Sequence, residues 1–128
     1  MSLRNDLRIM VVDDMSTSRA LITQALEELA IRHVSSSADA VAALQALAKS
    51  PVHLVISDFN MPGMDGLGLL RELRQNQRTQ NVGFILITGR ADNEMIQQGQ
   101  QLGMNNFITK PFTTGQLRDC IEAVVGRL

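Results

Sequence analysis

The chain has 128 residues, of which 45% are hydrophobic and 20% are charged, and its net charge is -1. This length fits one ordinary domain with its own core, and this balance is typical of a globular chain rather than a disordered one. The nearly neutral charge gives no electrostatic reason to expect nucleic acid or an acidic membrane as a partner. A single cysteine, Cys120, excludes an internal disulfide, and no apolar stretch approaches the roughly 20 residues of a membrane span. We therefore expect a soluble, cytoplasmic monomer.

The first half of the chain alternates two strand patterns with two helix patterns. An apolar run at 8–13 (RIMVVD) predicts a strand, and apolar residues at helical spacing predict a helix at 17–31. A weaker strand is predicted at 32–36. The next helix is predicted at 38–49, with Ser37 as its cap and Ser50-Pro51 as its end, because proline disfavours helical geometry in the residue before it.

The second half continues this alternation. The pattern predicts three strands, at 52–57, 82–88 and 106–109, and three helices, at 66 to about 76, at 91–102 and at 113–125. We expect Asp65 to cap the first of these helices and Gly103 to close the second. Thr113 and Gln116 have the spacing of a capping box at the start of the last helix.

Five strands that alternate strictly with five helices predict one parallel sheet covered by helices on both faces, an α/β fold. The three strong strands are continuous apolar runs, which is typical of strands buried on both faces. The sequence contains no internal repeat and no linker, so we expect 1–128 to be a single domain without an output domain. In an open sheet of this kind, ligands bind beyond the carboxyl ends of the strands.

Polar residues stand at those carboxyl ends: Asp13 and Asp14 after the first strand, Asp58 after the third, Thr88 at the end of the fourth, and Lys110 after the fifth. If the first and third strands are neighbours, three carboxylates meet in one pocket. Their three negative charges exceed the one positive charge of Lys110. Placing this excess charge in a pocket costs free energy unless a cation binds there. Oxygen ligands favour Mg²⁺. Each residue alone is explained by an ordinary turn or helix cap. Their occurrence together at one edge of the predicted sheet indicates a functional site.

Such a pocket suits phosphoryl transfer to a carboxylate. The transition state spreads negative charge over its oxygens, and a metal, an ammonium and a hydroxyl stabilise that charge. We therefore expect Asp58 to be the nucleophile and Asp13 and Asp14 to hold Mg²⁺. Thr88 and Lys110 would contact the phosphoryl oxygens. The expected function is a phosphoacceptor switch that takes part in its own phosphorylation and dephosphorylation, and not a metabolic enzyme.

Four segments resemble the receiver domain of two-component response regulators, and within that family the chemotaxis regulators. The matching segments are VVDDMSTSR (11–19), ISDFNMPGMDGLGLL (56–70), ITG (87–89) and KPFT (110–113). The resemblance extends over essentially the whole chain. It implies a flavodoxin-like, doubly wound sheet of strand order 2-1-3-4-5. It also implies phosphorylation of Asp58 by a histidine kinase, with Mg²⁺ as the cofactor.

The resemblance assigns further roles to single residues. The backbone carbonyl of Asn60 would be another Mg²⁺ ligand. Thr88 and Lys110 would be the switch hydroxyl and the phosphate-sensing lysine, with Pro111 in the peptide that follows. Phe107 stands where the family keeps an aromatic switch residue, which in chemotaxis regulators is usually tyrosine, and this chain has no tyrosine. The implied partners are a chemotaxis-type histidine kinase, the flagellar motor switch protein and a phosphatase.

Other functions remain open at this point. Within the family, the chain is alternatively a phosphate sink or a phosphorelay intermediate outside chemotaxis. From another class, a haloacid-dehalogenase-type aspartyl-phosphate phosphatase has a second acid where this chain has Asn60, and a cap for which this chain is too short. A flavodoxin shares the expected fold, but Asp13 and Asp14 would repel the phosphate of its flavin.

Overall fold

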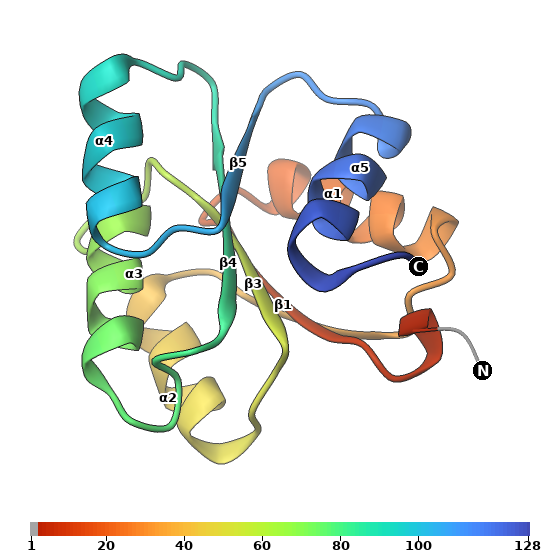
Figure 1. The fold of residues 1–128 in the computed structure, drawn as a ribbon, viewed down its shortest axis with the longest axis horizontal. Coiled ribbons are helices and arrows are strands. Elements are labelled where there is room, and N and C mark those ends of the chain that lie inside the picture. The colour runs from red at the N-terminus through yellow and green to blue at the C-terminus, as the bar shows by residue number, and fades with distance from the viewer. Residues whose placement is uncertain (1–2) are drawn as a thin grey trace.

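The computed structural model describes residues 3–128, which build a five-stranded parallel sheet flanked by helices (Figure 1). The strand order is β2-β1-β3-β4-β5, so the predicted doubly wound topology is confirmed. The strands are β1 (Arg8–Val12), β2 (His33–Ser37), β3 (Leu54–Asp58), β4 (Gly83–Thr88) and β5 (Asn106–Thr109). The helices are α1 (Ser16–Glu28), α2 (Ala40–Lys49), α3 (Gly66–Gln75), α4 (Asn93–Gln101) and α5 (Thr114–Val125), and a 3-10 turn at Leu3–Asn5 precedes β1.

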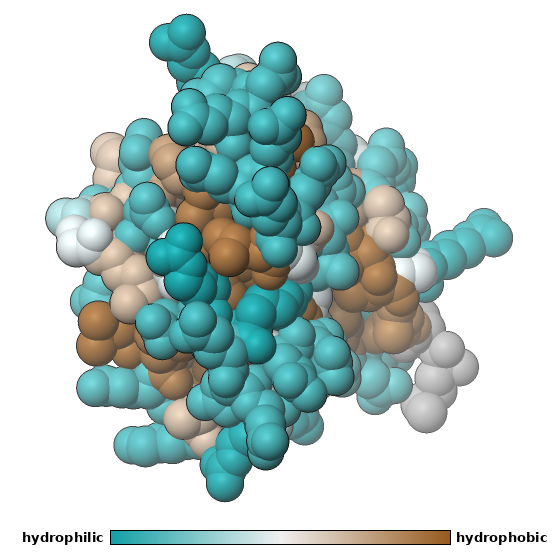
Figure 2. All heavy atoms as spheres, turned by 60° about the vertical axis from the view of Figure 1, so that its left-hand side comes forward, coloured by the Kyte–Doolittle hydropathy of each residue, from teal (hydrophilic) through white to brown (hydrophobic). Residues whose placement is uncertain are grey.

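The helices are divided between the two faces of the sheet, with α1 and α5 on one face and α2, α3 and α4 on the other (Figure 1). Each face has its own apolar cluster. One cluster contains Ile22, Leu26 and Ile121 from α1 and α5, and the other contains Leu69 and Leu73 from α3. Figure 2 views the molecule from the side of α2, α3 and α4, where polar side chains cover most of the surface and leave smaller apolar areas between them. Among residues 3–128, no helix is long and apolar enough to cross a membrane.

The central strand β3 and its neighbour β4 are buried along their whole length. Helices cover both of their faces, which explains why their sequences are uninterrupted apolar runs. The edge strands β2 and β5 are partly exposed, and the polar sequence of β2 (HVSSS) reflects this position. Asp58 therefore stands at the end of a strand that is buried along its whole length.

The start of α2 differs from the prediction, since Asp39 caps this helix and Ser37 does not. The side chain of Asp39 accepts a hydrogen bond of 2.7 Å from the backbone N–H of Ala42. Ser37 is instead the last residue of β2, and the helix begins at Ala40 rather than at 38. Both residue types are good caps, but the strand extends to Ser37 and leaves the capping position to the carboxylate.

Two helices are also shorter than predicted, α1 at its end and α4 at its start. α1 ends at Glu28 and not at 31, because Ala30 adopts a left-handed conformation with φ of 62°. The N–H of Ile31 then bonds back to the carbonyl of Leu26 and closes the helix. α4 begins after Asp92, whose side chain caps it, and so starts two residues later than predicted.

The predicted starts of α3 and α5 are confirmed. Asp65 accepts a hydrogen bond of 2.8 Å from the N–H of Gly68. Thr113 and Gln116 form the predicted capping box, in which each side chain binds the backbone of the other residue. Both motifs satisfy N–H groups that would otherwise lack partners at the first turn of a helix.

Gly66 places the start of α3 directly against the end of β3. A β-carbon at this position would lie 2.5 Å from the carbonyl oxygen of Asp58 and 2.7 Å from a methyl group of Leu86. The N–H of Gly66 also donates a hydrogen bond of 2.9 Å to the carbonyl of Phe59. Only glycine allows this approach, so α3 holds the backbone of Asp58 in place.

Candidate functional site

The carboxyl edge of the sheet brings together the acidic residues that the sequence singles out. Asp13 follows β1, Asp58 is the last residue of β3, and β1 pairs directly with β3. One carboxylate oxygen from each of Asp13, Asp14 and Asp58 lies within 4.8 Å of the others. Asp13 and Asp58 are buried, whereas Asp14 is exposed at the mouth of the cluster. The predicted meeting of three carboxylates is therefore present in the structure.

Lys110 reaches this cluster from the end of β5. Its Nζ lies 2.9 Å from Oδ1 of Asp58 and 3.8 Å from Oδ2 of Asp13. The same ammonium donates a hydrogen bond of 2.9 Å to the hydroxyl of Ser18, in the first turn of α1. Ser18 is not among the residues predicted for the site, and its position shortly after the acidic pair is the only hint of this contact in the sequence.

One carboxylate oxygen of Asp13 accepts a hydrogen bond from the backbone, and the other has no hydrogen-bond partner. Its Oδ1 accepts a hydrogen bond of 3.0 Å from the N–H of Met15, and its backbone carbonyl accepts one of 2.7 Å from Arg19. Its Oδ2 is buried and has no hydrogen-bond partner. A buried carboxylate oxygen without a partner is costly, and a cation removes that cost. The hard oxygen donors of this cluster fit Mg²⁺.

The hydroxyl of Thr88 is bound within its own loop. Thr88 is buried at the end of β4, and its Oγ1 donates to the carbonyl of Arg90 at 3.0 Å and accepts from the N–H of Arg90 at 3.2 Å. To reach a phosphoryl group, this hydroxyl must give up the carbonyl of Arg90. Asn60 lies two residues beyond Asp58 in the loop before α3 and is exposed. The ligand role of its backbone carbonyl remains a prediction.

Phe107 and Pro111 lie on either side of Lys110. Phe107 is half-buried in β5 and packs against the apolar cluster that contains Met95 of α4. The peptide bond between Lys110 and Pro111 is cis. The switch roles of both residues are likewise predictions. Their positions place them on the segment that carries the ammonium into the site.

Comparison with known proteins identifies the family. The response regulator receiver domain model matches residues 9–122. The chain belongs to this family. The match decides against the haloacid-dehalogenase-type phosphatase and against the flavodoxin. Receiver domains are switch modules that are phosphorylated on an aspartate and bind Mg²⁺ at an acidic pocket.

Relatives of this receiver domain resemble it over nearly their whole length. A probable chemotaxis protein CheY from Rhizobium etli is 41% identical over 128 residues, covering 100% of this chain and 99% of that protein. The chemotaxis protein CheY-3 of Vibrio cholerae is 33% identical, over 98% of this chain and 97% of its own. The structure of chemotaxis protein CheY4 of Vibrio cholerae superimposes with a TM-score of 0.88 at 26% identity, covering 93% of this chain and 98% of that one.

A further structural relative is the receiver domain of a sensor histidine kinase from Pseudomonas aeruginosa. It superimposes with a TM-score of 0.84 at 26% identity, covering 94% of this chain and 98% of that chain. Its structure contains a magnesium ion coordinated in the active-site cleft. The acidic cluster of the present receiver domain is consistent with a site of the same kind.

The pKa of Asp58 is raised above its ordinary value. Burial of the carboxyl group is the largest cause, and the negative charges of Asp13 and Asp14 add to it. The hydrogen bond and charge of Lys110 oppose the shift without cancelling it. In the absence of a cation, the receiver domain therefore holds an acid that resists ionisation.

We expect Asp58→Asn to stabilise the metal-free receiver domain at neutral pH. Because the pKa of Asp58 is higher in the folded state, its contribution to stability is fully present below the unfolded value of 3.8 and is lost as pH rises through the folded pKa. The free energy of unfolding of Asp58→Asn minus that of the parent should therefore grow as the pH rises from about 4 towards neutrality. Urea titrations in EDTA measure it, and a variant less stable than the parent at neutral pH contradicts it.

We expect Asp14→Ala and Asp13→Ala to separate metal binding from structure. Asp14→Ala should lose most of the Mg²⁺-induced rise in melting temperature while its metal-free melting temperature holds or rises, since one repelling charge is removed. Asp13→Ala should lose the Mg²⁺ response and also about 1 kcal/mol of metal-free stability, because the N–H of Met15 loses its acceptor.

Thermal melts in EDTA and in Mg²⁺ measure both effects. Asp6→Ala is the matched control, since it removes an exposed carboxylate before the other end of β1. An Asp14→Ala variant that keeps the parent's full Mg²⁺ response would rule out a ligand role for Asp14.

Proposed function

We propose that this receiver domain is a chemotaxis response regulator whose Asp58 accepts a phosphoryl group from a histidine kinase. Asp13, Asp14, Asp58 and the backbone carbonyl of Asn60 would hold Mg²⁺. The observation that carries this proposal is the environment of Asp58, whose carboxylate stands 2.9 Å from the ammonium of Lys110 within a cluster of three acids. A nucleophile, a cation site and a fixed positive charge are the parts that phosphoryl transfer to a carboxylate requires.

In the proposed reaction, an oxygen of Asp58 forms a bond to phosphorus as the bond from phosphorus to the donor histidine nitrogen breaks. When bound, Mg²⁺ would offset the charge of the phosphoryl oxygens. Lys110 favours the ionised form of Asp58 and would then donate a hydrogen bond to the phosphoryl group. The protein would thus assist its own phosphorylation and dephosphorylation without being a metabolic enzyme.

The response would run through Thr88 and Phe107. A phosphoryl group on Asp58 offers the hydroxyl of Thr88 a charged acceptor in place of the carbonyl of Arg90. Movement of Thr88 toward it would vacate space beneath α4. Phe107 is half-buried beside that helix and has no hydroxyl to keep in water, so it would turn further inward. The partner surface would then consist of α4, β5 and α5.

Chemotaxis is favoured over other signalling roles by the relatives, which are named chemotaxis proteins and match this chain in length. The proposed partners are a chemotaxis-type histidine kinase, the flagellar motor switch protein and a phosphatase, and the proposed form is a single-domain monomer. A phosphate sink that drains a shared kinase is the second candidate. It is favoured by Phe107, since chemotaxis regulators usually have tyrosine at this position.

We expect Asp58 to be labelled by acetyl phosphate only when Mg²⁺ is present, because otherwise the phosphoryl group must approach three carboxylates. Intact-mass spectra should show one added phosphoryl group on the parent and none on Asp58→Asn. Asp39→Asn is the control, since asparagine also caps α2 and the residue lies outside the acidic cluster. Equal labelling of Asp58→Asn and the parent would falsify the assignment.

We expect Phe107→Ala to weaken the gain in partner affinity on phosphorylation while labelling of Asp58 stays nearly intact. Truncation removes the apolar side chain that fills the vacated space. Binding of motor-switch and kinase proteins should be measured with and without beryllofluoride, a phosphoryl mimic. Binding to the kinase alone, with no motor binding by the parent, would select the phosphate sink. Full phosphate dependence in Phe107→Ala would make Phe107 a core residue only.

A further inference from the structure

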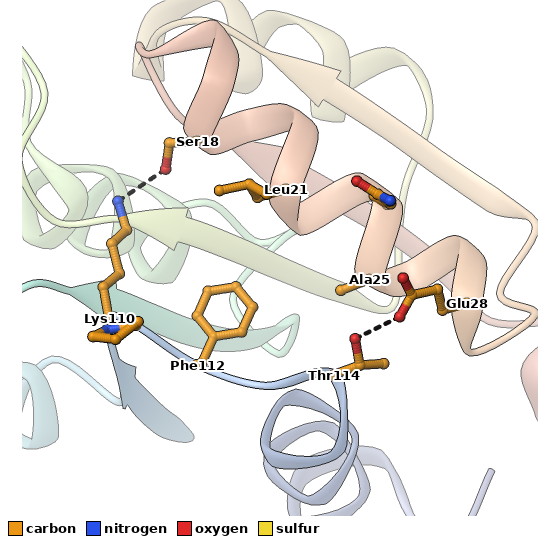
Figure 3. A pocket seen from close by; sticks show the side chains of 9 residues that line it. Ser18, Leu21, Ala25, Glu28, Lys110, Phe112 and Thr114 are labelled. Carbon is orange, nitrogen blue, oxygen red and sulfur yellow. Dashed lines mark hydrogen bonds between the residues drawn. The ribbon is translucent and has the colours of Figure 1, made fainter.

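The hydrogen bond between Lys110 and Ser18 connects two segments that are 92 residues apart in the chain. Figure 3 shows the ammonium of Lys110 turned toward the hydroxyl of Ser18 on α1. Ser18 is half-buried and has no other side-chain hydrogen bond among the described residues. Its neighbours Ser16 and Thr17 are exposed, so Ser18 is the hydroxyl residue of this turn that faces Lys110.

The ammonium of Lys110 lies closer to two of the polar groups around it than to the third. It lies 2.9 Å from Asp58 and 2.9 Å from Ser18, but 3.8 Å from Oδ2 of Asp13, which is too long for a hydrogen bond. Lysine has a flexible stem of four carbons, and a free ammonium between two carboxylates would settle between both. The second contact, to a neutral hydroxyl, keeps it to one side.

We propose that Ser18 is a positioning residue, which holds the ammonium of Lys110 on Asp58 and away from Asp13. This leaves Oδ2 of Asp13 without a partner and available to a divalent cation. The inference rests on the proposed function of the acidic cluster and deepens it. Ser18 acts through Lys110 and does not itself touch the cation or the phosphoryl group.

The surroundings of Ser18 keep this contact in place. Ser18 and Lys110 stand at one end of a groove of about 590 Å³ between α1 and the segment before α5, with Leu21 and Phe112 along its walls (Figure 3). At the other end, the hydroxyl of Thr114 donates a hydrogen bond of 2.7 Å to Glu28. The contact of Thr114 with Glu28 thus joins the C-terminal end of α1 to the chain that follows β5, as the contact of Lys110 with Ser18 does near the start of α1.

Ser18→Ala removes the hydroxyl that accepts a hydrogen bond from the ammonium of Lys110. A shift of about 1 Å then brings Nζ within hydrogen-bond distance of Oδ2 of Asp13, and Lys110 bridges both carboxylates. A divalent cation must displace this bridge before it binds. We expect the dissociation constant for Mg²⁺ to rise about three- to tenfold, the effect of one hydrogen bond. Ser18→Thr keeps a hydroxyl on the same β-carbon and should restore the affinity of the parent.

Mg²⁺ titrations followed by NMR shifts of the Asp13 and Asp58 amides test this inference. Ser16→Ala is the matched control, since it removes the same hydroxyl from the same helical turn at an exposed position. Weaker Mg²⁺ binding by Ser18→Ala alone, with rescue by Ser18→Thr, supports the positioning role. Parent-like affinity in Ser18→Ala overturns it. Equal loss in Ser18→Ala and Ser16→Ala also overturns it, because it points to a damaged helix.

The same samples separate this inference from the proposed function. Labelling of Asp58 by acetyl phosphate at saturating Mg²⁺ reports on the proposed function, whereas Mg²⁺ affinity reports on Ser18. If the parent protein binds Mg²⁺ but is not phosphorylated by acetyl phosphate, the proposed phosphorylation is wrong. The Mg²⁺ titrations then still decide the role of Ser18. A parent that does not bind Mg²⁺ overturns both.

Discussion

The contact between the ammonium of Lys110 and the carboxylate of Asp58 is the interaction on which the carboxyl edge of this sheet depends. Three acids approach one another there, and a single positive charge offsets them only in part. The ammonium arrives from β5, the strand that also carries the half-buried Phe107. A change of charge on Asp58 would therefore also reach β5 through Lys110, beside the proposed route through Thr88 and Phe107.

Asp13 shows that a structural and a functional explanation of one residue are compatible. An acidic pair after a strand is often a turn motif, and Asp13 indeed accepts the N–H of Met15. The same side chain keeps its second oxygen buried and unpaired. A carboxylate has two oxygens, and here the first stabilises the turn into α1 while the second remains for a ligand. The turn thus orients the oxygen that the proposed Mg²⁺ site would use.

The sequence was sufficient to predict which residues gather at the site, because the carboxyl ends of parallel strands share one edge. Asp13, Asp58 and Lys110 could be placed together on that ground alone. The bond of Thr88 to Arg90 and the bond of Lys110 to Ser18 could not, because they depend on side-chain rotamers and on where α1 crosses the sheet. The start of α2 differs from the prediction because two good capping residues, Ser37 and Asp39, stand close together, and strand pairing occupies Ser37.

The two glycines beside the site give the domain a mechanical asymmetry. At Gly66 a single added carbon would collide with the backbone of Asp58, so β3 and the start of α3 behave as one block with no slack. At Gly89, on the loop after β4, an added carbon would meet nothing within 4 Å. A side chain is therefore excluded where α3 meets the end of β3, whereas the loop between β4 and α4 has room for one.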